Sequence, residues 1–450
     1  MREVKMNEMI GQGLSYKNYK NALKKRFYNG VMMILLIIPF FRPDFISEML
    51  SDSWVNTIFT IWRIAAFLFV FGKYVKDFLK KPTIDFGLII ICIYEALLLY
   101  SSVKNQEMIG ERVVDIANFL GIYFIYIRYG KQYPKLFIKM NFYFFSLMIW
   151  LNAILTVIFP HGLNHATDNS ARVNFLGKDN TITLIFILTI VFCVLYHNIF
   201  PRGIGPFLTT AVIFVMQMYY ESGSGVVATL LIILYLCFAS ERKFVNKLLN
   251  VNLLFVVYMI LEVIIVFLNQ ISFMKPLFQI LNKASTFTDR RYYWNTAIAQ
   301  LLRCPIFGQG SGITYLWNNN YYSHNSFLDI LLKGGIVGAV LWCIMILVVM
   351  NRLKLKENLR IKGFMVCCFF GFLLVGLMEG LEDRIAFNAF LALVPTLNMM
   401  EESDVLRNKL INAGIKVKTN IKIVAKHKDE KDKKPKKKHK QKKISVRKRR

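Results

Sequence analysis

The chain has 450 residues, of which 55% are hydrophobic, and 57 Lys and Arg stand against 28 Asp and Glu. So many apolar runs of ~20 residues, the length that crosses a ~30 Å hydrocarbon core, exclude a soluble globular protein. We expect an all-α polytopic integral membrane protein, because only helices and closed barrels satisfy backbone groups in lipid and these runs lack the alternation of barrel strands. The net charge of +29 fits basic cytoplasmic loops better than nucleic-acid binding.

Residues 1–27 are rich in Lys and Arg, and we expect this segment to be cytoplasmic. Residues 28–400 form the predicted transmembrane domain. Its twelve apolar runs are centred near Ile34, Ala65, Ile90, Ile122, Met148, Leu188, Ile213, Leu231, Tyr258, Val340, Leu373 and Ala392. Basic segments fall in every second connection between these runs, so the pattern predicts twelve helices with both termini cytoplasmic. Residues 401–450 form a Lys/Arg-rich cytoplasmic tail, which we expect to be disordered at its end or held by anionic lipid.

The longest polar segment between apolar runs is the outer loop predicted at residues 270–323. Arg290 and Arg291 stand near its start, and Trp294 follows at helical spacing. The glycine-rich residues 308–312 lack the preceding strand and following helix of a phosphate-binding loop, so we interpret them as a flexible turn. An aromatic, asparagine-rich stretch then leads to the start of the next apolar run.

His324-Asn325 stands at the mouth of that run, where a histidine can exchange a proton near neutral pH. The alternative is a histidine that caps or packs the helix start. Arg290 and Arg291 suit a diphosphate, because a planar guanidinium binds two oxygens at once; the alternative is ordinary loop solvation. Arg172, in another predicted outer loop, is a second candidate cation. The glycines of residues 334–338 indicate close helix packing.

The remaining titratable residues give weaker signals. His161 and His165 have the spacing of a zinc pair, but Pro160, Gly162 and Asn164 argue against a helix, so we expect no metal site. An acidic cluster at Glu379, Glu382 and Asp383 could supply a base or hold a cation, or pair with Arg384. Asp85, Glu95 and Glu262 lie near or within apolar runs, where ionisable groups are often functional, but nothing in the sequence pairs them.

This pattern resembles the O-antigen ligase/polymerase superfamily, which includes Wzy-type polysaccharide polymerases. In that family an arginine before a tryptophan, a P-x-x-G-x-G segment and a His-Asn pair follow one another in a large outer loop. The matching positions here are Arg290, Trp294, Pro305, Gly308, Gly310, His324 and Asn325. The segment after Arg172 resembles the family's other outer arginine motif loosely, since Asp179 stands where proline is usual, and residues 222–225 lack the arginine of the short S-R turn.

The resemblance implies a glycosyltransferase that polymerises undecaprenyl-diphosphate-linked oligosaccharide repeat units into a surface polysaccharide, such as capsule, exopolysaccharide or O-antigen, outside the plasma (inner) membrane. Arg290, with Arg172 or Arg291, would clamp the diphosphate, and His324 would accept the proton of the acceptor hydroxyl. The other expected substrate-binding residues are Asn325, Trp294, Tyr321 and Tyr322, although aromatic residues at a membrane surface also serve as interfacial anchors.

We expect no cofactor and no nucleotide-sugar site. The expected partners are the lipid-linked oligosaccharide, membrane lipid and other polysaccharide assembly proteins. Two alternatives remain: an O-antigen-type ligase that transfers the glycan to another acceptor, and a transporter of lipid-linked oligosaccharides. A transporter would more typically show a polar central pathway than one long outer loop.

Overall fold

The computed structural model describes the chain apart from residues 1–15, 50–53, 81, 83–84, 107, 165–171, 179, 202, 269–285, 312–322, 356–357, 382–383 and 413–450. The chain divides into two compact units, Met1–Glu401 and Glu402–Arg450. Apart from residues 402–412 at the end of the last helix, all of the structure discussed below belongs to the first unit. The predicted outer loop at 270–323 is described only in part, and it contains a helix.

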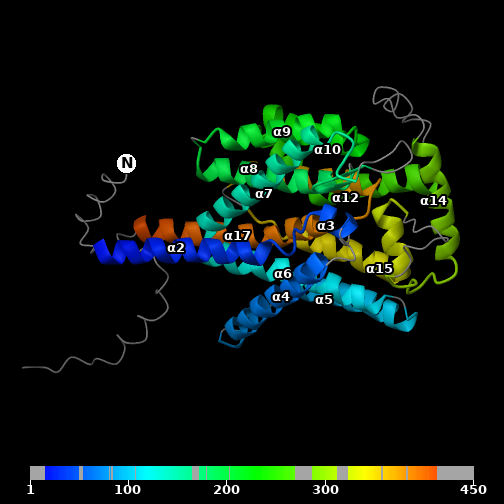
Figure 1. Ribbon diagram of the computed structural model, residues 1–450, viewed down its shortest axis with the longest axis horizontal. Coiled ribbons are helices and arrows are strands. Elements are labelled where there is room, and N and C mark those ends of the chain that lie inside the picture. The colour runs from blue at the N-terminus through cyan, green and yellow to red at the C-terminus, as the bar shows by residue number, and fades with distance from the viewer. Residues whose placement is uncertain are drawn as a thin grey trace, which may run out of the picture. The chain divides into compact units, whose positions relative to one another are not determined.

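Helices make up nearly all of the described chain (Figure 1). They are α2 (Tyr16–Ile37), α3 (Asp44–Met49), α4 (Trp54–Lys80), α5 (Phe86–Lys104), α6 (Ile109–Gln132), α7 (Pro134–Ile158), α8 (Ile182–Ile199), α9 (Gly205–Tyr219), α10 (Gly223–Leu234), α11 (Lys243–Leu248), α12 (Val251–Glu262), α14 (Thr286–Leu301), α15 (Ser326–Asn351), α16 (Leu359–Gly376) and α17 (Ile385–Asn412). The π-helical turns η1 (Tyr235–Ala239) and η2 (Val263–Phe267) extend α10 and α12. A small antiparallel hairpin pairs β1 (Val173–Asn174) with β2 (Gly177–Lys178).

The helices agree with the predicted class. Each of the twelve predicted apolar runs has its centre inside a helix. Within the described part of the chain, six helices (α4, α5, α7, α8, α15 and α16) are long and apolar enough to cross a membrane. The helices at residues 205–219, 223–239, 251–267 and 385–401 are apolar but shorter. The chain is therefore an all-α, multi-pass membrane protein, and the count of twelve spans stays a prediction.

Helices distant in sequence pack together to form the core. α15 lies along α5 and α4 packs on α6 (Figure 1), and α10 packs on α16. Two of the acidic residues that the sequence leaves unpaired find partners between helices. Buried Glu95 pairs with buried Arg112 of α6, and Asp85 pairs with Arg352 and accepts a hydrogen bond from Tyr123 at 2.6 Å. These pairings offset the cost of placing charges within apolar surroundings.

The helix α15 is interrupted at Gly335, whose φ of 63° and ψ of −163° are not helical. The segment of residues 305–310 lies against the break and replaces the missing intrahelical bonds. The amides of Gln309 and Gly310 donate to the carbonyls of Leu332 and Lys333 at 2.8 and 3.0 Å. On the other side of the break, the amides of Ile336 and Val337 donate to the carbonyls of Pro305 and Ile306 at 2.8 and 3.1 Å.

The 305–310 segment is also bonded to α5, because Asn105 Nδ2 donates to the Gly308 carbonyl at 3.2 Å. Gly308 and Gly310 have positive φ angles of 68° and 92°, which glycine adopts without steric cost. The interpretation of these glycines as a flexible turn is therefore wrong: they shape a bonded segment that packs on α15. Gly335 likewise provides the break itself, in addition to the close packing that the sequence predicts.

Candidate functional site

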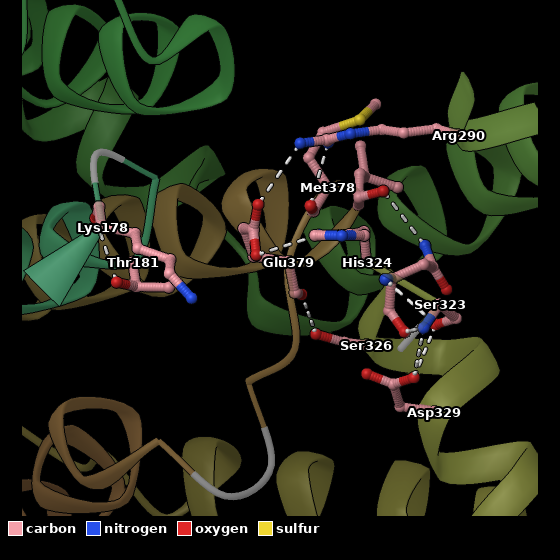
Figure 2. Close-up of polar contacts among 11 residues, drawn as sticks. Lys178, Thr181, Arg290, Ser323, His324, Ser326, Asp329, Met378 and Glu379 are labelled. Atoms are coloured by element: carbon pink, nitrogen blue, oxygen red, sulfur yellow. Dashed lines mark hydrogen bonds and ion pairs between the residues drawn. The ribbon is translucent and has the colours of Figure 1, made fainter. Parts of the chain in front are cut away.

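The candidate site lies where three parts of the chain meet (Figure 2). α14 contributes Arg290, the residues before α15 contribute His324, and the turn after α16 contributes Glu379. The sequence predicts the first two residues as the catalytic pair, and the structure brings both of them to the same carboxylate.

His324 projects from a tightly bonded backbone loop. Its neighbours Ser323 and Asn325 are fully buried, whereas the His324 side chain is 27% exposed. The Ser323 hydroxyl lies 2.6 Å from Oδ1 of Asp329 and 3.1 Å from the Asn325 amide, which donates to it. Asn325 caps α15, because its side-chain oxygen accepts from the Leu328 amide at 2.8 Å. Asn325 is thus held in place as the cap of α15, and His324, directly before it, keeps a partly exposed side chain.

Glu379 lies between the two predicted catalytic residues. Its Oε1 lies 3.3 Å from Nη2 of Arg290, and its Oε2 lies 3.6 Å from Nδ1 of His324. The second distance is long for a hydrogen bond, and such contacts often tighten when substrate binds. Glu379 is 2% exposed, so solvent screens these interactions weakly. An approach of the carboxylate to Nδ1 leaves Nε2 of His324 to face a substrate.

The turn that carries Glu379 is fixed to both neighbouring elements. Nη1 of Arg290 donates to the Met378 carbonyl at 2.9 Å, and the Ser326 hydroxyl donates to the Glu379 carbonyl at 2.7 Å. Arg384, which the sequence offers as a partner for the acidic cluster, instead lies 3.9 Å from Asp44. Glu382 and Asp383 lie outside the described residues.

The other predicted substrate-binding residues are either buried or outside the described residues. Trp294 of α14 is fully buried, which favours packing over contact with a sugar ring. The side chain of Arg291 and all of Tyr321 and Tyr322 lie outside the described residues. Asn325 directs its side chain inward and serves as the cap of α15.

Arg172 lies just before β1 and has a separate set of contacts. Its Nη1 donates to the Pro160 carbonyl at 3.2 Å, and its guanidinium stacks over the rings of Tyr219 and Tyr220 at 5.0 and 5.5 Å. The hairpin itself is connected to the turn after α16, because Gly177 packs against Asp44, the partner of Arg384. Figure 2 shows Lys178 and Thr181 of this region in the same view as Glu379. The described contacts of Arg172 do not include Arg290 or His324.

One residue of the site has no strong sequence signal. Glu262, at the end of α12, is fully buried, and Nδ2 of Asn325 donates to its two oxygens at 3.1 and 2.9 Å. An acid within an apolar run is a signal of function, but its spacing gives no indication of the partner. Among the described residues, no group of three or more His, Cys, Asp or Glu side chains is placed to hold a metal ion.

Comparison with known proteins finds a family match for the part of the chain that contains Arg290 and His324. Residues 207–343 match the family model described as O-antigen ligase, and the match includes Glu262, Arg290 and the His324-Asn325 pair. It ends before Glu379. No curated protein and no solved structure matches the chain. The predicted resemblance to the O-antigen ligase/polymerase superfamily is thus confirmed for residues 207–343, which form an O-antigen ligase-like region of the chain.

Proposed function

We propose that the protein polymerises undecaprenyl-diphosphate-linked oligosaccharide repeat units at the outer face of the plasma membrane, with both termini in the cytoplasm. The observation that best supports this proposal is the contact of Arg290 and His324 with the same buried carboxylate of Glu379. A guanidinium and an imidazole at one carboxylate support the roles of cation and proton acceptor, and residues 207–343 resemble a family that handles lipid-linked glycans.

The reaction requires little beyond these groups. The acceptor hydroxyl oxygen forms a bond with the anomeric carbon of the donor, and the bond from that carbon to the diphosphate breaks. Undecaprenyl diphosphate leaves with the bonding electron pair, and the hydroxyl proton passes to Nε2 of His324. Glu379 stabilises the imidazolium that forms, as a carboxylate does beside a catalytic histidine.

Arg290 stabilises the leaving diphosphate. A guanidinium has five N–H donors, so its contacts with Met378 and Glu379 leave donors for phosphate oxygens. Arg172 and Arg291 are the proposed second cations. Tyr321 and Tyr322, which directly precede the buried Ser323, are proposed to contact sugar rings, and Trp294 and Asn325 to support the substrate site from within.

The test is a rate measurement with purified protein and lipid-linked repeat units. His324→Ala should lower the rate by about 10²- to 10⁴-fold, the usual contribution of a positioned acid or base. His197→Ala is the matched control, because His197 lies in α8 with its ring against Phe207, and it should keep the wild-type rate. Normal polymer synthesis by His324→Ala would contradict the proposal.

A ligase is the second candidate, and the description of the matching family model favours it. A ligase would use the same donor but transfer the glycan to a lipid core or another acceptor. Deletion of the protein distinguishes the two activities. Loss of a polymerase leaves single lipid-linked units, whereas loss of a ligase leaves long chains on the lipid carrier.

A further inference from the structure

Glu262 is a carboxylate buried within an apolar helix, and the proposed reaction does not use it directly. Its side chain is fully buried, and its described contacts are all with hydrogen-bond donors. The Tyr258 hydroxyl donates at 2.5 Å, and the amide of Asn325 donates to both oxygens. An acid in such a position is costly unless it is well bonded, and ionisable groups within apolar helices are often functional.

The Asn325 side chain connects three helices. Its oxygen caps α15 through the Leu328 amide, and its Nδ2 donates to Glu262 of α12 and to the Leu377 carbonyl, at 3.1 Å, after α16. Leu377 is two residues from Glu379. The Glu262–Asn325 contact therefore fixes the start of α15 relative to the turn that carries Glu379.

The backbone of His324 requires such support. Its φ angle is 53°, in the left-handed region that residues with a side chain rarely adopt. A conformation of this kind persists only where the surrounding structure determines it, and such sites are often functional. Here the two neighbours of His324 are fully buried and bonded.

We propose that Glu262 is a positioning residue: by holding the Asn325 amide, it fixes the left-handed backbone at His324 and directs the imidazole toward Glu379 and the substrate. This inference rests on the proposed function, in which His324 accepts the proton of the acceptor hydroxyl. Glu262 itself does not touch the reacting atoms.

The hydrogen bond from Asn325 to Glu262 can be tested by exchanging its donor and its acceptor. Glu262→Gln keeps the size of the side chain but turns one acceptor into a donor that faces the donor of Asn325. Asn325→Asp keeps an oxygen that can cap α15 but places a second carboxylate against Glu262. The double variant pairs the introduced amide with the introduced carboxylate, so it restores a donor opposite an acceptor.

The three variants are purified in detergent and assayed with lipid-linked repeat units. Each single variant should lower kcat by about 10-fold or more, the effect of a lost hydrogen bond to a charged group, with KM for the lipid-linked unit unchanged. The double variant should recover most of the lost kcat. Glu262→Gln should cause no further loss in the His324→Ala background, because the two residues act as one unit.

The matched control is Glu95→Gln, which makes the same change at another buried intramembrane carboxylate, the partner of Arg112. It should keep the wild-type kcat, and thermal unfolding should show that all variants are folded. Wild-type kcat in Glu262→Gln would overturn the inference, as would a double variant no better than the worse single one. Full activity of His324→Ala would instead refute the proposed function, whatever the Glu262 variants do.

Discussion

Substitution of Gly308 by alanine tests whether the 305–310 segment determines the shape of α15. A Cβ atom at this position would lie 2.5 Å from the Gly335 nitrogen, the Leu332 oxygen and the Lys333 carbonyl carbon. All three are backbone atoms, so no side-chain rotation can relieve the contact. The substitution must move the 305–310 segment away from the break in α15, and its hydrogen bonds must lengthen.

The size of the effect follows from two terms. The left-handed φ of Gly308 costs an alanine roughly 1 to 2 kcal/mol, and overpacking against a fixed backbone costs roughly 1 to 3 kcal/mol more. The sum, about 2 to 5 kcal/mol, is a large part of the 5–15 kcal/mol by which a folded domain is typically stable. Because α15 begins beside His324, we also expect a loss of glycan synthesis.

The measurement is thermal unfolding of the purified protein in detergent. Unfolding is monitored through the buried thiols of Cys193, Cys367 and Cys368, which react with a fluorogenic reagent as they become exposed. Gly72→Ala is the control, since a Cβ at Gly72 in α4 would meet no atom within 4 Å. Its unfolding temperature should equal or exceed that of the wild type. If Gly308→Ala unfolds at the same temperature as Gly72→Ala and synthesises glycan normally, the 305–310 segment does not determine the geometry of the site.

Three further outcomes are expected. Arg290→Lys keeps the charge but loses the planar fork, so glycan synthesis should fall severely, whereas Arg291→Lys should have a milder effect; equal tolerance would move the diphosphate contact to other cations. Removal of residues 426–450 should leave the rate per molecule unchanged, because this tail is proposed to face the cytoplasm, and a truncated protein present at normal level but inactive would contradict this. A cysteine introduced near Asn319 should react with an impermeant thiol reagent in intact cells and one near Lys437 should not, and the reverse pattern would overturn the proposed topology.

Local sequence signals predicted much of the architecture. Apolar runs located the centres of twelve helices, and the His-Asn pair before an apolar run marked the start of α15. Contacts between distant residues have no such signal. Glu379 reaches Arg290 across 89 positions of the chain, and Glu262 reaches Asn325 across 63. The glycines of the 305–310 segment indicated unusual backbone angles, but only the folded chain shows that their amides complete the hydrogen bonds of another helix.

The break at Gly335 affects how the protein responds to the thickness of the bilayer. After the break, Ile336, Val340 and Ile344 form an exposed apolar stripe along one face of α15, whereas residues 326–334 are almost entirely buried. A mismatch between a helix and its bilayer is accommodated by tilting, which acts on the lipid-facing part. The carbonyls before the break are bonded to the 305–310 segment and to α5, so a tilt of the second half bends the chain at Gly335. Such a tilt also acts on the 305–310 segment, because the amides of Ile336 and Val337 after the break are bonded to it.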